Sequence, residues 1–216
     1  MSFDINEAVF DAAGTYLEEK ALHYEHDLMD QFAASPEGQA ITERGTELGW
    51  AGVLIHYAIS SLGVTPATMI PSDLEAVVFG LFPRKVITER GDGAEIIQEL
   101  SAFWRFLERV YHLPRAKPIL AGLTPQAARR LERELQEPTN FGMAKSFVLM
   151  GQQAGFDMES PEGMRAWVEA YNATVAPKIT TAASRHRRSP TEQPSRVGIK
   201  GKRHAPRRQQ KRTPPH

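Results

Sequence analysis

The chain has 216 residues, with 26 basic side chains, 26 acidic side chains and no cysteine. Disulfides, thiolate metal sites, iron–sulfur clusters and cysteine nucleophiles are therefore excluded. The formal charge of zero conceals a division: residues 184–216 hold 11 Lys or Arg and one acid, which leaves 15 basic and 25 acidic residues in the preceding body. The body carries a net charge of −10 and this C-terminal segment +10.

The N-terminal segment and the apolar stretches predict neither export nor membrane insertion. Met1–Glu7 lacks both a positive region and an apolar run, so it does not match a signal peptide. The longest apolar stretch, Leu48–Gly63, includes His56 and is shorter than the roughly 20 residues that a membrane-spanning helix needs. We expect a cytoplasmic protein with no membrane contact.

Apolar periodicity predicts two long helices in the first third of the chain. Over residues 4–33, apolar side chains that include Phe10 recur at steps of three, four or seven, which is one helical stripe. Ser35-Pro36 then supplies an N-cap and a first-turn proline for a helix over 37–62. This second helix has apolar residues on two sides, so we expect it to be the central helix.

Helical patterns continue through the rest of the body. Ser72 is expected to cap a short helix through Leu81, ended by Pro83, and a stronger helix over 94–112 directs Phe103 and Val110 inward. Further helices are predicted over 116–123, 125–137, 140–154 and 161–172. No stretch alternates with a period of two, so the sequence predicts an all-α fold, a single bundle of about seven to eight helices over residues 1–177.

Residues 178–216 form a basic tail of different composition, rich in Arg, Lys, Pro, Gln, Gly and Ser. Such a segment buries too little apolar surface to offset the entropy of ordering, which predicts disorder. Its cations would neutralise phosphates without reading sequence, and the lack of aromatic residues argues against base stacking. The candidate nucleic-acid-binding residues of the tail are Arg185, Arg187, Arg188, Arg196, Lys200, Lys202, Arg203, Arg207, Arg208, Lys211 and Arg212.

Four side chains of metal-ligand type share one face of the first predicted helix: Glu19, His23, His26 and Asp30. Their spacing of four, three and four residues returns to one side of a helix. The apolar stripe occupies the opposite side, so the four side chains are interpreted as a solvated face. We predict no metal site.

A strip of small residues runs along the second predicted helix: Gly45, Gly49, Gly52 and His56, extended by Ser60. Each glycine within a helix lowers stability by roughly 0.5–1 kcal/mol relative to alanine. Several glycines on one face therefore suggest that small residues are needed there. We favour a close helix crossing over a bound ligand. If a ligand pocket were present instead, its candidate residues would be Trp50, His56, Tyr57 and Ser60.

Seven basic residues in and around the helix over 94–112 form a candidate anion-binding patch: Arg84, Lys85, Arg105, Arg109, His112, Arg115 and Lys117. The same helix also carries Glu95, Glu99 and Glu108, whose negative charges reduce the positive potential of the patch. We therefore interpret the patch as an ordinary solvated face. Asn140–Ser146 lacks the glycines of a phosphate loop, and no hydrolase, zinc-protease or dinucleotide motif is present. No catalytic residue and no cofactor is predicted.

The segment Leu74–Val86 ends in Phe-Pro-Arg-Lys-Val and is followed by a helix that contains Phe103, Trp104 and Phe106. This pattern resembles an uncharacterised bacterial all-helical family with a Leu-Pro-Arg-Lys-Val turn before a Leu-x-Ala-Phe-x-x-Phe helix. Phe82 stands here in place of the usual leucine. The resemblance covers residues 30–150 and implies a bacterial helical domain with no established activity.

Together these features predict a non-enzymatic bacterial helical protein whose tail associates with nucleic acid or another polyanion. An alternative is a protein-interaction module whose tail pairs with the acidic N-terminal helix or with an acidic partner. Exposed pairs of that kind contribute about 0–1 kcal/mol each and weaken with salt. A less favoured alternative is a small-molecule binder or an enzyme that uses the surroundings of His56.

Overall fold

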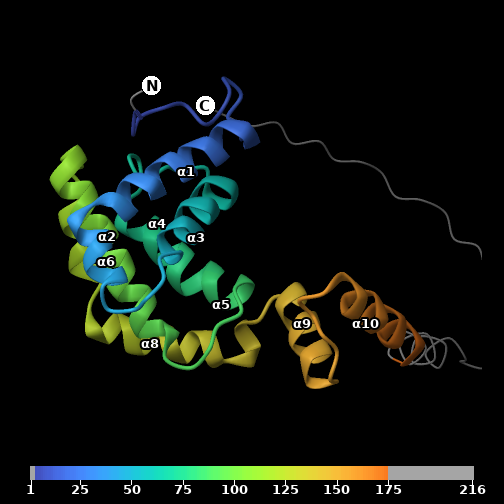
Figure 1. Ribbon diagram of the computed structural model, residues 1–216. Coiled ribbons are helices and arrows are strands. Elements are labelled where there is room, and N and C mark those ends of the chain that lie inside the picture. The colour runs from blue at the N-terminus through green and yellow to red at the C-terminus, as the bar shows by residue number, and fades with distance from the viewer. Residues whose placement is uncertain (1–2, 175–216) are drawn as a thin grey trace, which may run out of the picture. The chain divides into compact units, whose positions relative to one another are not determined.

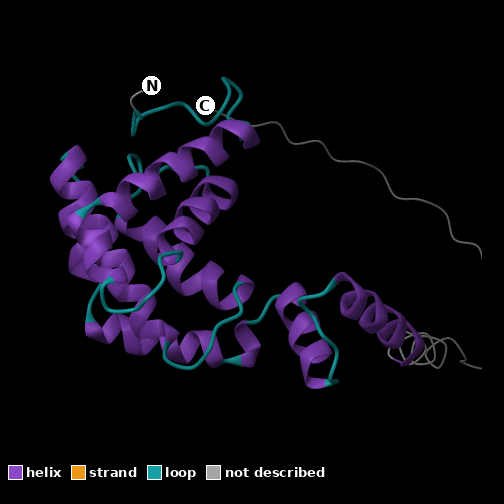
Figure 2. Ribbon diagram, in the orientation of Figure 1, coloured by secondary structure: helices purple, strands orange, loops and turns teal. Residues whose placement is uncertain are grey.

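The computed structural model describes residues 3–174, and its regular structure there is helical (Figures 1 and 2). The α-helices are α1 (Glu18–Ala34), α2 (Pro36–Thr42), α3 (Trp50–Tyr57), α4 (Pro71–Glu75), α5 (Phe82–Lys85), α6 (Asp92–Tyr111), α7 (Ala116–Gly122), α8 (Pro125–Gln136), α9 (Met143–Gln153) and α10 (Pro161–Thr174). Two π-helical segments, η1 (Ala58–Leu62) and η2 (Ala76–Leu81), and a 3₁₀ turn, η3 (Pro138–Asn140), complete the series. The predicted all-α fold is confirmed for this part of the chain.

The chain is divided into two compact units, and the boundary between them falls within the sequence of α10, after Met164. The first unit holds α1 to α9. In the second, the rings of Trp167 and Tyr171 contact each other with centroids 5.6 Å apart. The predicted boundary at residue 177 and the basic tail lie outside the described residues and stay predictions. Within residues 3–174, no helix combines the length and apolarity needed to cross a membrane.

Helix α6 is the central helix of the first unit and packs against α2, α3, α7 and α8. The sequence predicted its ends to within two residues, and its apolar stripe is fully buried at Ile96, Leu100, Phe103 and Leu107. Two expectations for this helix were wrong. Val110, expected inward, is 39% exposed, and Glu99, counted with the charges of a solvated face, is completely buried.

The second predicted helix is divided into α2 and α3 by a turn, so it is not the central helix. Gly45 lies in the turn with φ of +82°, a left-handed conformation that favours glycine. The residues between this turn and Trp50 are not helical. Gly45 and Gly49 therefore lie outside α3, and of the predicted strip only Gly52 and His56 lie on this helix.

Helix α1 begins later than predicted, at Glu18. Before it, the Asp11 carboxylate accepts a 2.8 Å hydrogen bond from the Thr15 N–H, and Gly14 has φ of +80°. Side-chain hydrogen bonds to nearby backbone compete with helix formation. Phe10, counted in the predicted stripe, therefore lies in a turn that closes with an isolated antiparallel bridge to Tyr16.

The helix expected from Ser72 through Leu81 also has different ends. It begins at Pro71, where the Asp73 carboxylate accepts a 3.0 Å hydrogen bond from the Ile70 N–H, so the cap is not Ser72. It passes through η2 into α5, where Pro83 occupies the first turn. Proline is tolerated at that place because the N–H it lacks is not needed there.

Candidate functional site

A cleft between α1 and α3 contains the histidine that the sequence singled out. Its volume is about 410 Å³, and its lining residues are Glu25, Met29, Gly49, Gly52, Val53, His56, Tyr57 and Val86. Ligand pockets for small molecules begin at roughly this size. The favoured close helix crossing is not found along the strip, because a Cβ at Gly45 or Gly49 would meet nothing within 4 Å. A Cβ at Gly52 would make ordinary contact with Met29, whose Cγ would lie 3.7 Å away.

Two titratable side chains face each other in this cleft. Glu25 Oε2 lies 3.7 Å from His56 Nδ1, and the two side chains are 27% and 52% exposed. Burial raises the pKa of Glu25, and the neighbouring His56 opposes this by lowering it. A second hollow, of about 120 Å³, shares Glu25 and His56 with the first and extends to Tyr16 and Ile59. The pair can therefore accept or donate a hydrogen bond to a ligand in either hollow.

The predicted pocket residues are only partly brought together. Tyr57 lines the cleft beside His56, and the Lys85 ammonium lies 4.8 Å from the centroid of its ring. Trp50 instead packs against Phe82 with ring centroids 6.2 Å apart. Ser60 is exposed and lines neither hollow. The π-helical segment η1 begins directly after Tyr57, and such segments are frequent at functional sites.

Glu25 was not predicted as a cleft residue because it belongs to the acidic N-terminal helix, which was interpreted as a surface that could pair with the tail. It follows Ala21 by four residues and precedes Leu28 by three, and both of these neighbours are buried. That spacing places Glu25 at the edge of the apolar stripe of α1. The stripe therefore contained a signal that this carboxylate faces a neighbouring helix.

Glu99 is a buried carboxylate that fixes the start of α3. Glu99 Oε1 accepts hydrogen bonds from the N–H groups of Gly49 at 3.0 Å and Ala51 at 2.8 Å. Burial raises the pKa of Glu99, and the backbone hydrogen bonds partly oppose that rise. A negative charge is favourable at a helix N-terminus, where backbone N–H groups lack partners. Its role is structural, because it positions the helix that forms one wall of the cleft.

The four side chains considered as metal ligands are all exposed, as a solvated face requires. His23 Nδ1 lies 2.8 Å from the backbone oxygen of Glu19. His26 Nε2 lies 3.4 Å from Asp30 Oδ2, with both side chains at least 70% exposed. Across residues 3–174, no three His, Asp or Glu side chains are grouped to hold a metal ion.

Four members of the predicted basic patch have separate partners. Arg109 pairs with Glu37, Arg115 donates to the Thr68 carbonyl at 2.9 Å, and Lys117 lies 3.9 Å from Glu108. Lys85 donates to the Ser61 hydroxyl at 3.4 Å, and His112 ends α6 with φ of +52°. Arg105 instead lines a hollow with Arg44, a residue that the sequence analysis did not connect with it.

Comparison with protein-family models, with curated proteins and with solved structures gives no match to this chain. This agrees with the resemblance described above, which carries no established activity. The eleven candidate residues of the tail lie outside residues 3–174.

Proposed function

We propose that this protein associates with polyanions, including nucleic acid, through its basic C-terminal tail and without catalysing a reaction. The observation that carries the proposal is the charge division: 11 basic residues and one acid in residues 184–216, against a net charge of −10 before them. Lys and Arg bind phosphates by releasing condensed counterions, which gives affinity without sequence selectivity. The anionic body repels the same ligand, so binding is directed to the tail.

The contacts of several cations in the body support this assignment. Arg109 lies 2.7 Å from Glu37 and Arg130 lies 2.8 Å from Glu75. The Lys145 ammonium donates to two backbone carbonyls and its side chain is buried. A cation that already has an internal partner must lose it before it can bind a phosphate, so these residues contribute less than the tail.

Fluorescence anisotropy with a labelled mixed-sequence DNA duplex tests the proposal. The logarithm of the association constant should fall linearly with the logarithm of salt concentration, with a slope of about 0.9 per phosphate neutralised. A full-length variant with all eleven tail cations replaced by glutamine should lose binding. A control with the same 33 tail residues in scrambled order should bind equally well. Retained binding in the glutamine variant, or loss in the scrambled one, would contradict the proposal.

The cleft supports a second candidate function, the binding of a small organic cation. A half-buried Glu25 carboxylate faces a hollow that also offers the apolar side chains of Met29 and Val53. A carboxylate beside an apolar surface is a favourable environment for an organic amine, because it accepts charged hydrogen bonds from the ammonium group. Titration with benzylamine and with benzyl alcohol, followed at the Met29 methyl resonance, should show tighter binding of the amine.

Two variants separate this specific contact from general attraction to the acidic helix. Glu25→Gln should remove the preference for benzylamine. Asp27→Asn, which changes an exposed residue of the same helix, should leave it intact. Equal affinity of the unmodified protein for the two compounds would exclude the cation site.

A further inference from the structure

A groove between α2 and α6 brings together two arginines that are far apart in the sequence. Arg44 follows α2 and Arg105 lies on α6, and both line a hollow of about 290 Å³. The other lining residues are Pro36, Glu37, Ala40, Ile41, Gln98 and Ala102. Both arginines are exposed, and neither side chain has an ion-pair or hydrogen-bond partner within the part of the chain that the structure describes.

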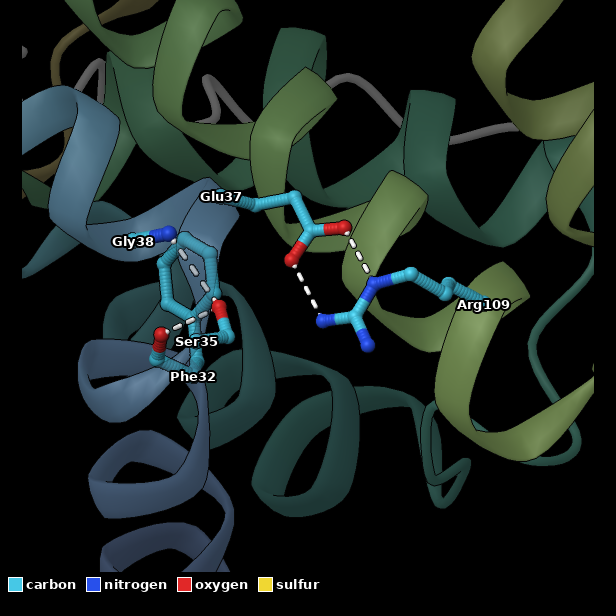
Figure 3. A network of polar contacts seen from close by, with 5 residues as sticks. All are labelled: Phe32, Ser35, Glu37, Gly38 and Arg109. Atoms are coloured by element: carbon cyan, nitrogen blue, oxygen red, sulfur yellow. Dashed lines mark hydrogen bonds and ion pairs between the residues drawn. The ribbon is translucent and has the colours of Figure 1, made fainter.

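The lining carboxylate of this groove is already paired (Figure 3). Glu37 Oε1 and Oε2 accept hydrogen bonds from Arg109 Nε and Nη2, each at 2.7 Å. Hydrogen bonding to Arg109 lowers the pKa of Glu37, so the carboxylate stays ionised and bound to that partner. It therefore does not neutralise Arg44 or Arg105.

Hydrogen bonds close to the groove fix the positions of the two helices that form its walls. Ser35 Oγ accepts a 3.2 Å hydrogen bond from the Gly38 N–H and donates a 2.6 Å hydrogen bond to the Phe32 carbonyl (Figure 3). This cap fixes the start of α2, and the Glu37–Arg109 pair joins α2 to α6. The two walls of the groove are thus connected without either of the unpaired arginines.

The charges and surfaces of the groove suit one class of ligand. Three arginines and one glutamate in this cluster leave two positive charges in excess. Guanidinium groups bind phosphate and carboxylate oxygens in a planar, two-pronged geometry. The Gln98 amide can donate a further hydrogen bond. Ala40, Ile41 and Ala102 provide an apolar surface for the carbon part of such a ligand.

We propose that the α2–α6 groove binds a small organic oxyanion. Its phosphate or carboxylate group lies between Arg44 and Arg105, and its carbon part contacts Ala40, Ile41 and Ala102. This site is separate from the polyanion association proposed for the tail. A negative result in the test of one proposal leaves the other unaffected.

Amide NMR titrations test the site in the full-length chain whose eleven tail cations are replaced by glutamine, which removes competing cations. The probes are phenyl phosphate, benzoate and inorganic phosphate. Saturable shifts are expected at Gln98 and Ala102, and phenyl phosphate should bind more tightly than inorganic phosphate because it adds an apolar contact. The tighter of phenyl phosphate and benzoate identifies the preferred oxyanion.

Substitutions then establish which side chains hold the ligand. Arg44→Gln and Arg105→Gln should each weaken binding roughly tenfold, as expected for loss of a charged hydrogen-bonding partner. Arg129→Gln, at an exposed site on α8, should leave the affinity unchanged. Unfolding midpoints should agree among the three variants, because each changes an exposed side chain. The absence of saturable shifts, equal binding of phenyl and inorganic phosphate, or unchanged affinity in either groove variant would overturn the proposal.

Discussion

Glu99 on α6 accepts a 2.8 Å hydrogen bond from the backbone N–H of Ala51 in the first turn of α3. The central helix therefore determines where α3 begins, through a side chain rather than through apolar packing alone. The same contact places Gly52 and His56, which follow on α3, in the wall of the cleft. Disturbing Glu99 should consequently affect both stability and cleft geometry.

Glu99→Gln should lower the free energy of unfolding by about 1–3 kcal/mol at pH 7, because an amide nitrogen replaces one of the two acceptor oxygens beside the Gly49 N–H. Urea denaturation measures the change. Glu95→Gln is the matched control, since Glu95 is an exposed residue of the same helix. A loss for Glu99→Gln no larger than that of the control would show that the cap contributes little.

The stability difference between the unmodified protein and Glu99→Gln should also depend on pH. Burial raises the pKa of Glu99 above 4.5, so the folded state binds this proton more tightly than the unfolded state. The advantage of the unmodified protein should be largest below pH 4.5 and should decline as pH rises through the folded-state pKa. Paired urea denaturation curves across this range measure it. A difference that grows with pH would reverse the expected sign.

Gly93→Ala should destabilise the chain by about 1–3 kcal/mol, as overpacking does in close-packed interiors. A Cβ at Gly93 would lie 2.8 Å from the backbone nitrogen of Glu132 and 3.0 Å from the Ala128 carbonyl oxygen. These backbone atoms of α8 cannot move aside as a flexible side chain can. Thermal unfolding compares this variant with Gly80→Ala, whose Cβ would meet nothing within 4 Å. Equal effects at the two glycines would contradict the close approach of α6 and α8.

Lys145→Met should destabilise the packing of α9 by about 1–3 kcal/mol. The Lys145 ammonium donates to the Pro83 carbonyl at 3.1 Å and the Leu135 carbonyl at 3.3 Å, and lies 4.0 Å from the centroid of the Phe141 ring. Methionine keeps much of the apolar stem but removes these hydrogen bonds. Hydrogen exchange should accelerate more at α9 amides than at α6 amides, and uniform acceleration would argue against a local role.

A double-mutant cycle should show favourable coupling between Glu37 and Arg109 at pH 7. The variants are Glu37→Gln, Arg109→Gln and their combination, measured by urea denaturation. Arg109 holds the pKa of Glu37 below 4.5 in the folded state, so the contribution of the pair is present above pH 4.5. It should be lost as pH falls through the folded-state pKa, and high salt should weaken it. Coupling that persists in acid would indicate a contact that is not ionic.

Sequence patterns predicted those helices correctly whose first and last turns are determined by residues nearby in the sequence. The central helix α6 was placed to within two residues because its apolar stripe is long and Asp92-Gly93 marks its beginning. The division between α2 and α3 was missed because Gly45 fits the periodicity of a continuous helix. Its positive φ and the distant Glu99 cap, which end one helix and start the next, are not visible in that periodicity.

The cleft and the groove were only partly predictable for a related reason. In the cleft, His56 and Tyr57 were identified from the sequence, but Glu25, which lines the cleft with them, comes from another helix. In the groove, Arg105 lies near Arg44 only because α2 packs on α6. Residues on one helix can be placed by their spacing, since 3.6 residues make a turn. No such rule relates residues on two helices whose crossing depends on the packing of the whole core.

The amino-acid sequence by itself determined the all-α class, most of the helical segments and the separation of charge between body and tail, because these depend on composition and short-range periodicity. Tertiary structure alone decided that Glu99 is buried, and that Arg44 and Arg105 lie at the surface with no side-chain partner among residues 3–174. The reason is that desolvation and pairing depend on which helix lies opposite a side chain, and that is set by long-range packing.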